Sequence, residues 1–426
     1  MTWTGTYSLP ASATPVQIAV DGRTVALGPG HSWAQRVFVS SSGSRVRFTL
    51  PSGVVFDGVA NGETVHGTVR QGRVRGTFSF RRGVSRIVQL LGAYRGASGG
   101  VAITEADGLP PTLTEFPSGA MHGISPSLTV GKLLGDTRGD GSIAVDAAGF
   151  TWNGVHYARV LVQQREVRVG VDAATLTIPS GPGPFPAVVM VHGSGRRTRD
   201  EFDIFTAYFA LNGVAVIADD KRGVGESGGR YPGDLAARGT VDLLAGDARA
   251  EVRFLSTLKE VDSRRIGLFG DSQAGWIVPV AAAGDAAVDW AILNSGPTVT
   301  VGESDDWGSL AGESESQPSG TRAQMLAQVR AAGPSGFDPI GALRALTIPV
   351  LWMYGSDDRN VPTELCVDRL TVLKPGHDFS WIVLPTAHTP IQLPTGLLSS
   401  LPQSPGFDPR FFPSLDSWLR DRSITH

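Results

Sequence analysis

The feature that most restricts how this chain can fold is an apolar run that ends in a serine between small residues. The run 266–269 is followed by Gly-Asp-Ser-Gln-Ala-Gly at 270–275, and a helix-compatible segment begins at Trp276. A strand, a serine on a tight turn and a helix form a nucleophile elbow. Such a turn is strained and passes close to neighbouring backbone, so it needs small side chains two residues either side of the serine. Ser272 has glycine and alanine there. A chain with 54 glycines can also produce this pattern by chance, so the rest of the chain must support it.

From about residue 161 onward, apolar strands alternate with helical segments. The helical segments include 202–211, 245–258 and 339–346, and a final helix is predicted at 413–421. The candidate strands are 166–169, 174–178, 187–191, 214–217, 266–269, 290–293, 350–353 and 381–384. Alternation with near-continuous apolar strands predicts an α/β fold, a mostly parallel sheet flanked by helices.

The chain before residue 161 has a different character. Residues 1–105 read as an all-β module, with short alternating segments separated by turn residues and a hairpin over 64–80 that closes at Gln71-Gly72. Residues 106–160 are rich in Gly, Pro and Ser, and we interpret them as a connecting segment with strand content near 157–162. Residues 161–426 are the predicted catalytic domain.

Residues with catalytic chemistry follow the predicted strands at their carboxyl ends, where parallel sheets form their sites. In chain order they are the run His192-Gly193-Ser194-Gly195, then Ser272, the pair Asp357 and Asp358, and His388. A serine hydroxyl needs an imidazole to accept its proton, and the imidazole needs a carboxylate to fix its tautomer. The order Ser, Asp, His is that of α/β-hydrolases. Backbone N–H groups of Gln273 and of the loop at Gly193 and Ser194 are candidate donors for an oxyanion hole.

Two choices among these residues need an argument. His377 precedes the last strand and His388 follows it, and six strand residues span roughly 20 Å. His377 is therefore expected at the far edge of the sheet, which favours His388 as the base. Asp357 and Asp358 point to different sides, and the spacing Gly355-x-x-Asp358-x-x-Val361-Pro362 favours Asp358.

Composition excludes several classes of function. The apolar fraction is 41%, the charged fraction 18% and the formal charge −3, which gives no support to nucleic acid or an anionic membrane as the main partner. Cys366 is the only cysteine and no histidine spacing suits a metal, so neither a metal nor a disulfide is expected. The Gly-x-Gly-x-x-Gly run at 223–228 does not open a helix after a first strand, so no dinucleotide cofactor is expected either. We see no signal peptide and no membrane span, and expect a cytoplasmic protein.

Three runs together resemble the α/β-hydrolase superfamily, most closely bacterial serine esterases and peptidase-like hydrolases with a β-rich module before the catalytic domain. They are the loop 192–195, the run 220–229 and the elbow 270–276, completed by 355–362 and His388. The resemblance covers about 165–426. Asp271 stands where many relatives have His, and Ala274 where they usually have Gly, which leaves subfamily and substrate open.

The resemblance implies a serine hydrolase that cleaves a carboxylic ester, or alternatively a thioester or amide, of a small molecule through an acyl-enzyme. The alternative is acyl transfer, cyclisation or carbon–carbon bond chemistry at the same Ser272, His388 and Asp358. A small cap over the pocket is expected around 296–348, with an acidic, glycine-rich stretch at 302–319 and a helix at 322–332. The oligomeric state is open, and a homo-oligomer is one alternative.

Overall fold

The computed structural model divides the chain into two compact units, and each is described by itself. Unit 1 contains Met1–Thr114 and His122–Arg159, and unit 2 contains Glu115–Met121 and Val160–His426. The structure describes residues 2–389 and 406–425, except 10–11, 22–23, 28–34, 37–39, 43, 50–54, 83–88, 105–110, 125–127, 133–140 and 314–316.

The first sheet of unit 1 has nine strands in the order β4-β3-β2-β1-β9-β8-β7-β6-β5. Their bounds are β1 Thr2–Leu9, β2 Ser12–Asp21, β3 Thr24–Leu27, β4 Gln35–Arg36, β5 Ser40–Ser42, β6 Arg45–Thr49, β7 Val55–Asn61, β8 Thr64–Gln71 and β9 Val74–Arg82. The predicted hairpin is confirmed, because β8 and β9 pair antiparallel up to Gln71 opposite Val74. Four phenylalanines of β6, β7 and β9 stack on one another: Phe48, Phe56, Phe78 and Phe80. They form the apolar face of this sheet.

A second sheet follows, with eight strands in the order β14-β13-β12-β11-β10-β17-β16-β15. The bounds are β10 Gly92–Gly96, β11 Gly99–Thr104, β12 Thr112–Phe116, β13 Met121–Ile124, β14 Val130–Lys132, β15 Ala144–Val145, β16 Gly149–Trp152 and β17 Val155–Arg159. The segment 106–160, interpreted above as a connector, thus carries the strands β12 to β17. These strands have two to five residues each, which is too short for a period-two pattern to stand out. Tyr94, Phe150 and Tyr157 pack in the core of this second sheet.

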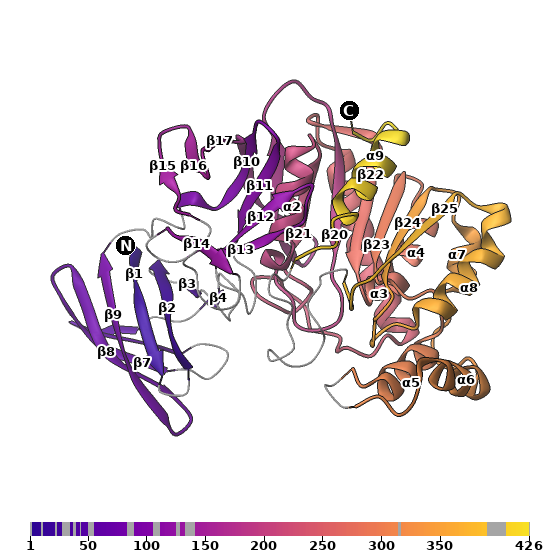
Figure 1. Ribbon diagram of the computed structural model, residues 1–426, viewed down its shortest axis with the longest axis horizontal. Coiled ribbons are helices and arrows are strands. Elements are labelled where there is room, and N and C mark those ends of the chain that lie inside the picture. The colour runs from indigo at the N-terminus through magenta and orange to yellow at the C-terminus, as the bar shows by residue number, and fades with distance from the viewer. Residues whose placement is uncertain are drawn as a thin grey trace. The chain divides into compact units, whose positions relative to one another are not determined.

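The sheet of unit 2 has eight strands in the order β18-β19-β21-β20-β22-β23-β24-β25 (Figure 1). The bounds are β18 Val162–Val169, β19 Asp172–Pro179, β20 Phe185–Val191, β21 Ala215–Asp219, β22 Val261–Asp271, β23 Trp290–Asn294, β24 Val350–Gly355 and β25 Phe379–Leu384. All eight strands predicted after residue 161 are present. The pairs β18–β19 and β19–β21 are antiparallel, and the pairs from β21 to β25 are parallel. The sheets of the described residues are largely antiparallel, and parallel pairing is found in this sheet between β21 and β25.

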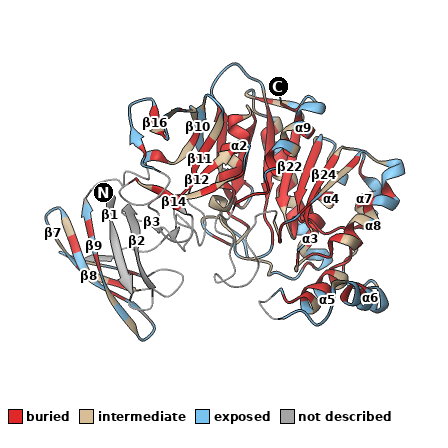
Figure 2. Ribbon diagram, in the orientation of Figure 1, coloured by how far each residue is buried: buried red, intermediate tan, exposed pale blue. Residues whose placement is uncertain are grey.

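Helices cover both faces of this sheet (Figure 1). On one face lie α2 (Asp203–Leu211), preceded by η1 (Arg199–Phe202), and α9 (Phe411–Asp421), where Phe205 contacts both Phe269 and Phe411. On the other face lie α3 (Arg238–Ser256), α4 (Ala274–Ala283) and α8 (Thr363–Leu373), which ends in η2 (Lys374–Gly376). Because both faces are covered, the strands β20, β21, β23 and β24 and the second half of β22 are buried (Figure 2). This burial explains their apolar runs.

The segment predicted as a cap contains three helices, α5 (Val301–Ala311), α6 (Arg322–Ala332) and α7 (Ile340–Ala345). The helix at 322–332 is confirmed, whereas α5 lies in the acidic, glycine-rich stretch where no helix was predicted. Thr300 and Glu303 form a capping box that starts α5, and Thr321 and Gln324 form one that starts α6. Each box satisfies backbone N–H groups that the first turn leaves open. Within the described part of the chain, no helix is both long and apolar enough to cross a membrane.

Candidate active site

The predicted elbow is present at the end of β22. That strand ends at Asp271, α4 begins at Ala274, and Ser272 between them has a φ of 53°. A positive φ is uncommon for a residue with a side chain and marks local strain. Gly270 explains the need for small neighbours, because a Cβ there would lie 2.5 Å from the Cβ of Ala274 and 2.7 Å from the Val191 oxygen. The sequence around the turn therefore fits its geometry.

Asp358 and His388, the predicted acid and base, form a pair at the ends of β24 and β25. Nδ1 of His388 lies 3.0 Å from Oδ1 and 2.9 Å from Oδ2 of Asp358, whose side chain is fully buried. The N–H groups of Asn360 and Val361 donate to the same Oδ1 at 2.8 and 2.9 Å. These contacts fix the carboxylate in place, and it in turn fixes the orientation of the imidazole.

The electrostatic surroundings favour the protonated form of His388. Burial lowers the pKa of His388, but the charge and hydrogen bond of Asp358, with the charges of Asp271 and Glu313, outweigh that effect and raise the pKa above 6.5. Burial, together with repulsion from Glu201, raises the pKa of Asp271 to about 7. A base whose cation is stabilised accepts a proton more readily, which is what activation of a hydroxyl requires.

The end of β23 anchors both the elbow and the histidine loop. Ser272 donates its backbone N–H to the Asn294 oxygen at 2.9 Å. Thr389, next to His388, donates its backbone N–H to Oγ of Ser295 at 3.0 Å. Asn294 and Ser295 are consecutive, so the two loops that carry the predicted nucleophile and base are attached to the same strand end.

Asp357 and His377, the alternatives to Asp358 and His388, do not join this pair. Asp357 is exposed, and its backbone N–H bonds the Thr386 oxygen. His377 precedes β25, and its ring nitrogens face the carbonyl oxygens of Leu373 and Arg344 at 2.8 and 3.2 Å. Parallel strands carry their carboxyl ends on one edge, so His377 lies at the edge opposite His388.

The loop after β20 runs beside the elbow. A Cβ on Gly193 would lie 3.1 Å from the Asp271 oxygen and 3.3 Å from the Cβ of Ser272. Gln273 stands at the N-terminus of α4, where backbone N–H groups have no partner within the helix. Ser194 follows Gly193 and is exposed. These positions suit donors to an oxyanion that forms next to Ser272.

Lys221 is a site residue that the sequence did not single out. Its side chain is buried, and Nζ donates to the Gly193 oxygen at 2.6 Å and to Oε1 of Gln273 at 2.9 Å. Nε2 of Gln273 donates to the Asp234 oxygen at 2.9 Å, and Oδ1 of Asp234 accepts the N–H of Gly195 at 2.5 Å. Burial, opposed chiefly by the charge of Asp234, lowers the pKa of Lys221 to about 8. The Lys221 ammonium thus joins the loop at Gly193 and Ser194 to Gln273 at the start of α4.

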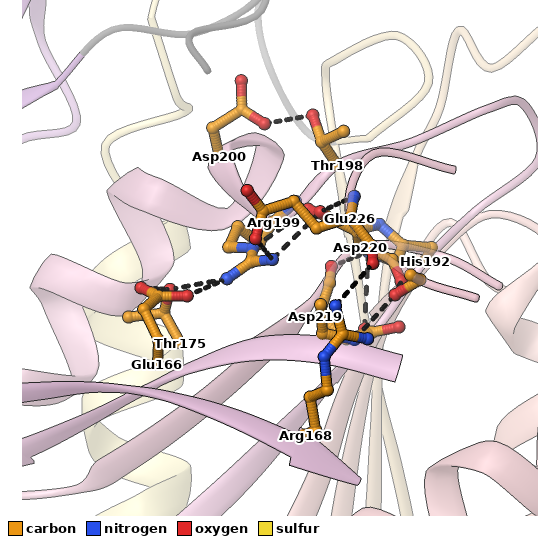
Figure 3. Close-up of polar contacts among 12 residues, drawn as sticks. Glu166, Arg168, Thr175, His192, Thr198, Arg199, Asp200, Asp219, Asp220 and Glu226 are labelled. Atoms are coloured by element: carbon orange, nitrogen blue, oxygen red, sulfur yellow. Dashed lines mark hydrogen bonds and ion pairs between the residues drawn. The ribbon is translucent and has the colours of Figure 1, made fainter. Parts of the chain in front are cut away.

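His192, which starts the loop after β20, and Arg199, which follows that loop, each contact neighbouring polar groups. Nε2 of His192 lies 2.7 Å from the Asp219 oxygen, and Nδ1 lies 3.2 Å from Glu201. Both nitrogens are engaged, so His192 is a structural partner. Arg199 lies between Asp220, to which Nε and Nη2 donate at 3.0 Å, and Glu166 (Figure 3). Burial opposes the positive charge of Arg199, but Asp220 and Glu166 raise its pKa further.

Helix α5 of the predicted cap is hydrogen-bonded to the turn that carries Asp358. Nε1 of Trp307 in α5 donates to the Asp358 backbone oxygen at 3.2 Å, and Oγ of Ser304 donates to the Asn360 oxygen at 3.1 Å. The guanidinium of Arg322 in α6 lies 4.7 Å from the centre of the Trp307 ring. Trp307 is therefore a packing and positioning side chain.

Comparison with known proteins gives partial matches. No family model matches the chain. An uncharacterised 31.7 kDa protein of Escherichia coli is 31% identical over 116 residues, which are 27% of this chain and 39% of that protein. Esterase EstD of Thermotoga maritima is 31% identical over 127 residues, which are 28% of this chain and 29% of that protein. The chain thus spans well under half the length of both relatives. A solved esterase of Pyrococcus furiosus is 16% identical over 62% of this chain and 90% of its own, with a TM-score of 0.43.

Proposed function

We propose that the chain is a serine hydrolase of the α/β-hydrolase type that cleaves a carboxylic ester of a small molecule, in line with its partial similarity to an esterase. Thioesters and amides are variants of the same chemistry. The observation that carries the proposal is the His388–Asp358 pair at 2.9 Å, attached to the same strand end as Ser272 on its positive-φ turn. We also propose that residues 161–426 form the catalytic domain, with the cap at 296–348.

The proposed reaction has two halves. The Ser272 oxygen attacks the acyl carbonyl carbon while His388 takes the hydroxyl proton, and Asp358 stabilises the imidazolium that results. The carbonyl oxygen becomes an oxyanion that accepts hydrogen bonds from the backbone N–H groups of Gln273 and Ser194. The intermediate collapses and expels the alcohol, which takes the proton from His388. A water molecule, deprotonated by His388, then attacks the acyl-enzyme, and the carboxylic acid is released as the Ser272 oxygen takes that proton back from His388.

The alternative of acyl transfer, cyclisation or carbon–carbon bond chemistry shares the first half-reaction. It differs in what attacks the acyl-enzyme. The expected cytoplasmic location and the oligomeric state stay predictions.

The test is a substrate series with an inactive control. Wild type and Ser272→Ala are assayed with p-nitrophenyl acyl esters of increasing chain length and with aminoacyl amides. We expect ester hydrolysis by the wild type and a loss of turnover of up to about 10⁶-fold in Ser272→Ala, as for nucleophile deletions in serine proteases. Equal rates for the two proteins would refute the assignment. Burst kinetics without turnover in water, relieved by an alcohol or amine acceptor, would favour acyl transfer.

A further inference from the structure

Three buried carboxylates of unit 2 lie together beside His192, the first residue of the loop 192–195. Asp172 starts β19, Asp219 ends β21 and Glu251 lies in α3. Their exposed fractions are 1%, 9% and 2%, and one oxygen from each lies within 4.8 Å of the others. We call these three residues the acidic cluster. Neither the proposed reaction nor the sequence analysis uses them.

The acidic cluster has unsatisfied oxygens. Oδ1 of Asp172 and Oε1 of Glu251 are buried and have no hydrogen-bond partner among the described residues. A buried carboxylate without a partner is costly, so such groups pair with a cation or give up their charge. These two side chains therefore need either a proton or a cation.

The neighbouring cationic side chains are already engaged elsewhere. Nζ of Lys221 bonds Gly193 and Gln273, and Arg222 pairs with Asp247 at 2.8 Å. Nε2 of His192 lies 3.5 Å from Oδ1 of Asp219 (Figure 3). The charge of Arg222 also acts on Asp172, but Arg222 is shared with Asp247. The cationic side chains near the acidic cluster are thus shared with other acceptors.

A small cavity adjoins the acidic cluster. Its volume is about 30 Å³, and its polar lining comes from His192, Asp219, Lys221, Arg222, Asp247 and Glu251. One water molecule needs roughly 10–15 Å³ of such space. The cavity therefore has room for a water molecule or a small ion.

We propose that the acidic cluster binds one hard divalent cation of the calcium class. All three ligands are carboxylate oxygens, the donors that such cations prefer. Two oxygens on opposite sides of Ca²⁺, each bonded at about 2.3–2.6 Å, lie up to roughly 4.6–5.2 Å apart, which accommodates a cluster that fits within 4.8 Å. Mg²⁺ gives up its water reluctantly and is seldom held by protein ligands alone, so a buried site of protein carboxylates favours the larger cation. The cation joins β19, β21 and α3 and supports the strand end that His192 contacts.

The test measures calcium binding and thermal unfolding of the full chain. Wild type is stripped with a chelator, and Ca²⁺ or Mg²⁺ is added from micromolar to millimolar concentrations. We expect one Ca²⁺ per chain by equilibrium dialysis and a Tm that rises with calcium, with a weaker response to Mg²⁺. Glu251→Gln and Asp172→Asn should each lose the bound ion and the Tm shift. Asp242→Asn, an exposed acid of the same helix α3, should keep both.

Two results would overturn the cation site. One is a wild type that binds no calcium, with a Tm that depends on pH alone, because protons would then neutralise the acidic cluster. The other is a calcium-dependent shift that persists in both cluster variants, because the ion would then bind elsewhere. If one variant fails to fold, the other variant and the wild-type stoichiometry decide. Ester hydrolysis by the calcium-free protein distinguishes a failure here from a failure of the proposed function.

Discussion

Nζ of Lys221 donates a hydrogen bond to the Gly193 carbonyl at 2.6 Å, and this contact orients the peptide that follows it. In a planar trans peptide the C=O and the next N–H point in opposite directions. Because Lys221 holds the Gly193 oxygen, it turns the Ser194 N–H to the other side of the loop. The second bond of Lys221, to Gln273, couples this loop to the other proposed oxyanion donor.

We therefore expect Lys221→Met to lower kcat by up to about 10²–10³-fold, the effect of losing one oxyanion donor, with little change in KM. The measurement is steady-state kinetics on a p-nitrophenyl ester. Lys259→Met, which removes an exposed lysine, serves as the control and should behave as wild type. A change confined to KM would contradict the positioning role.

The adjacent acids at 357 and 358 provide a matched pair for the proposed triad. Asp358→Asn should lower kcat by roughly 10⁴-fold, because the amide no longer holds His388 in the tautomer that accepts a proton. The amide oxygen can still accept the N–H groups of Asn360 and Val361, so the fold should persist. Asp357→Asn should leave kcat unchanged. If both variants lost activity equally in the same assay, Asp358 would have no special role.

The pH profile tests the surroundings of His388. Its pKa is raised above 6.5, so kcat/KM should rise with pH through a value above 6.5 as the imidazole becomes neutral. The negative charge of Asp271 is one cause of that increase. Asp271→Asn should therefore move this limb of the profile toward lower pH. A shift toward higher pH would show that Asp271 does not stabilise the imidazolium.

Two glycine substitutions should change stability in opposite directions. A Cβ on Gly267 in β22 would lie 2.1 Å from the ring of Trp290 in β23, so Gly267→Ala should destabilise by about 1–3 kcal/mol through overpacking. Gly246, inside α3, has no atom closer than 4.0 Å to such a Cβ. Gly246→Ala should stabilise by roughly 0.5–1 kcal/mol. Urea unfolding midpoints measure both, and equal midpoints would show that the strand relaxes around the added methyl group.

The sequence predicted the strands of unit 2, the elbow at Ser272 and the pairing of His388 with Asp358, because each depends on a local pattern at the end of a strand. Lys221 was missed because its partners lie 28 and 52 residues away, and no local pattern links them. Helix α5 was missed because glycine and acidic residues obscured the capping box at Thr300.

The acidic cluster was missed for a related reason, although α3 carried a signal. Glu251 is three residues after Ala248 and one before Val252, on the apolar face of the helix. A carboxylate on such a face is unusual and indicates a buried partner. Its companions Asp172 and Asp219 come from strands, and only the fold brings the three together.

The central claim is that Ser272 is a nucleophile activated by His388. The most direct measurement is reaction with a fluorophosphonate probe, followed by peptide mapping by mass spectrometry on wild type, His388→Ala and Asp357→Asn. We predict one covalent adduct at Ser272 in wild type and Asp357→Asn, and labelling slowed by orders of magnitude in His388→Ala. An adduct on a different residue, or equally fast labelling of Ser272 without the imidazole, would contradict this account.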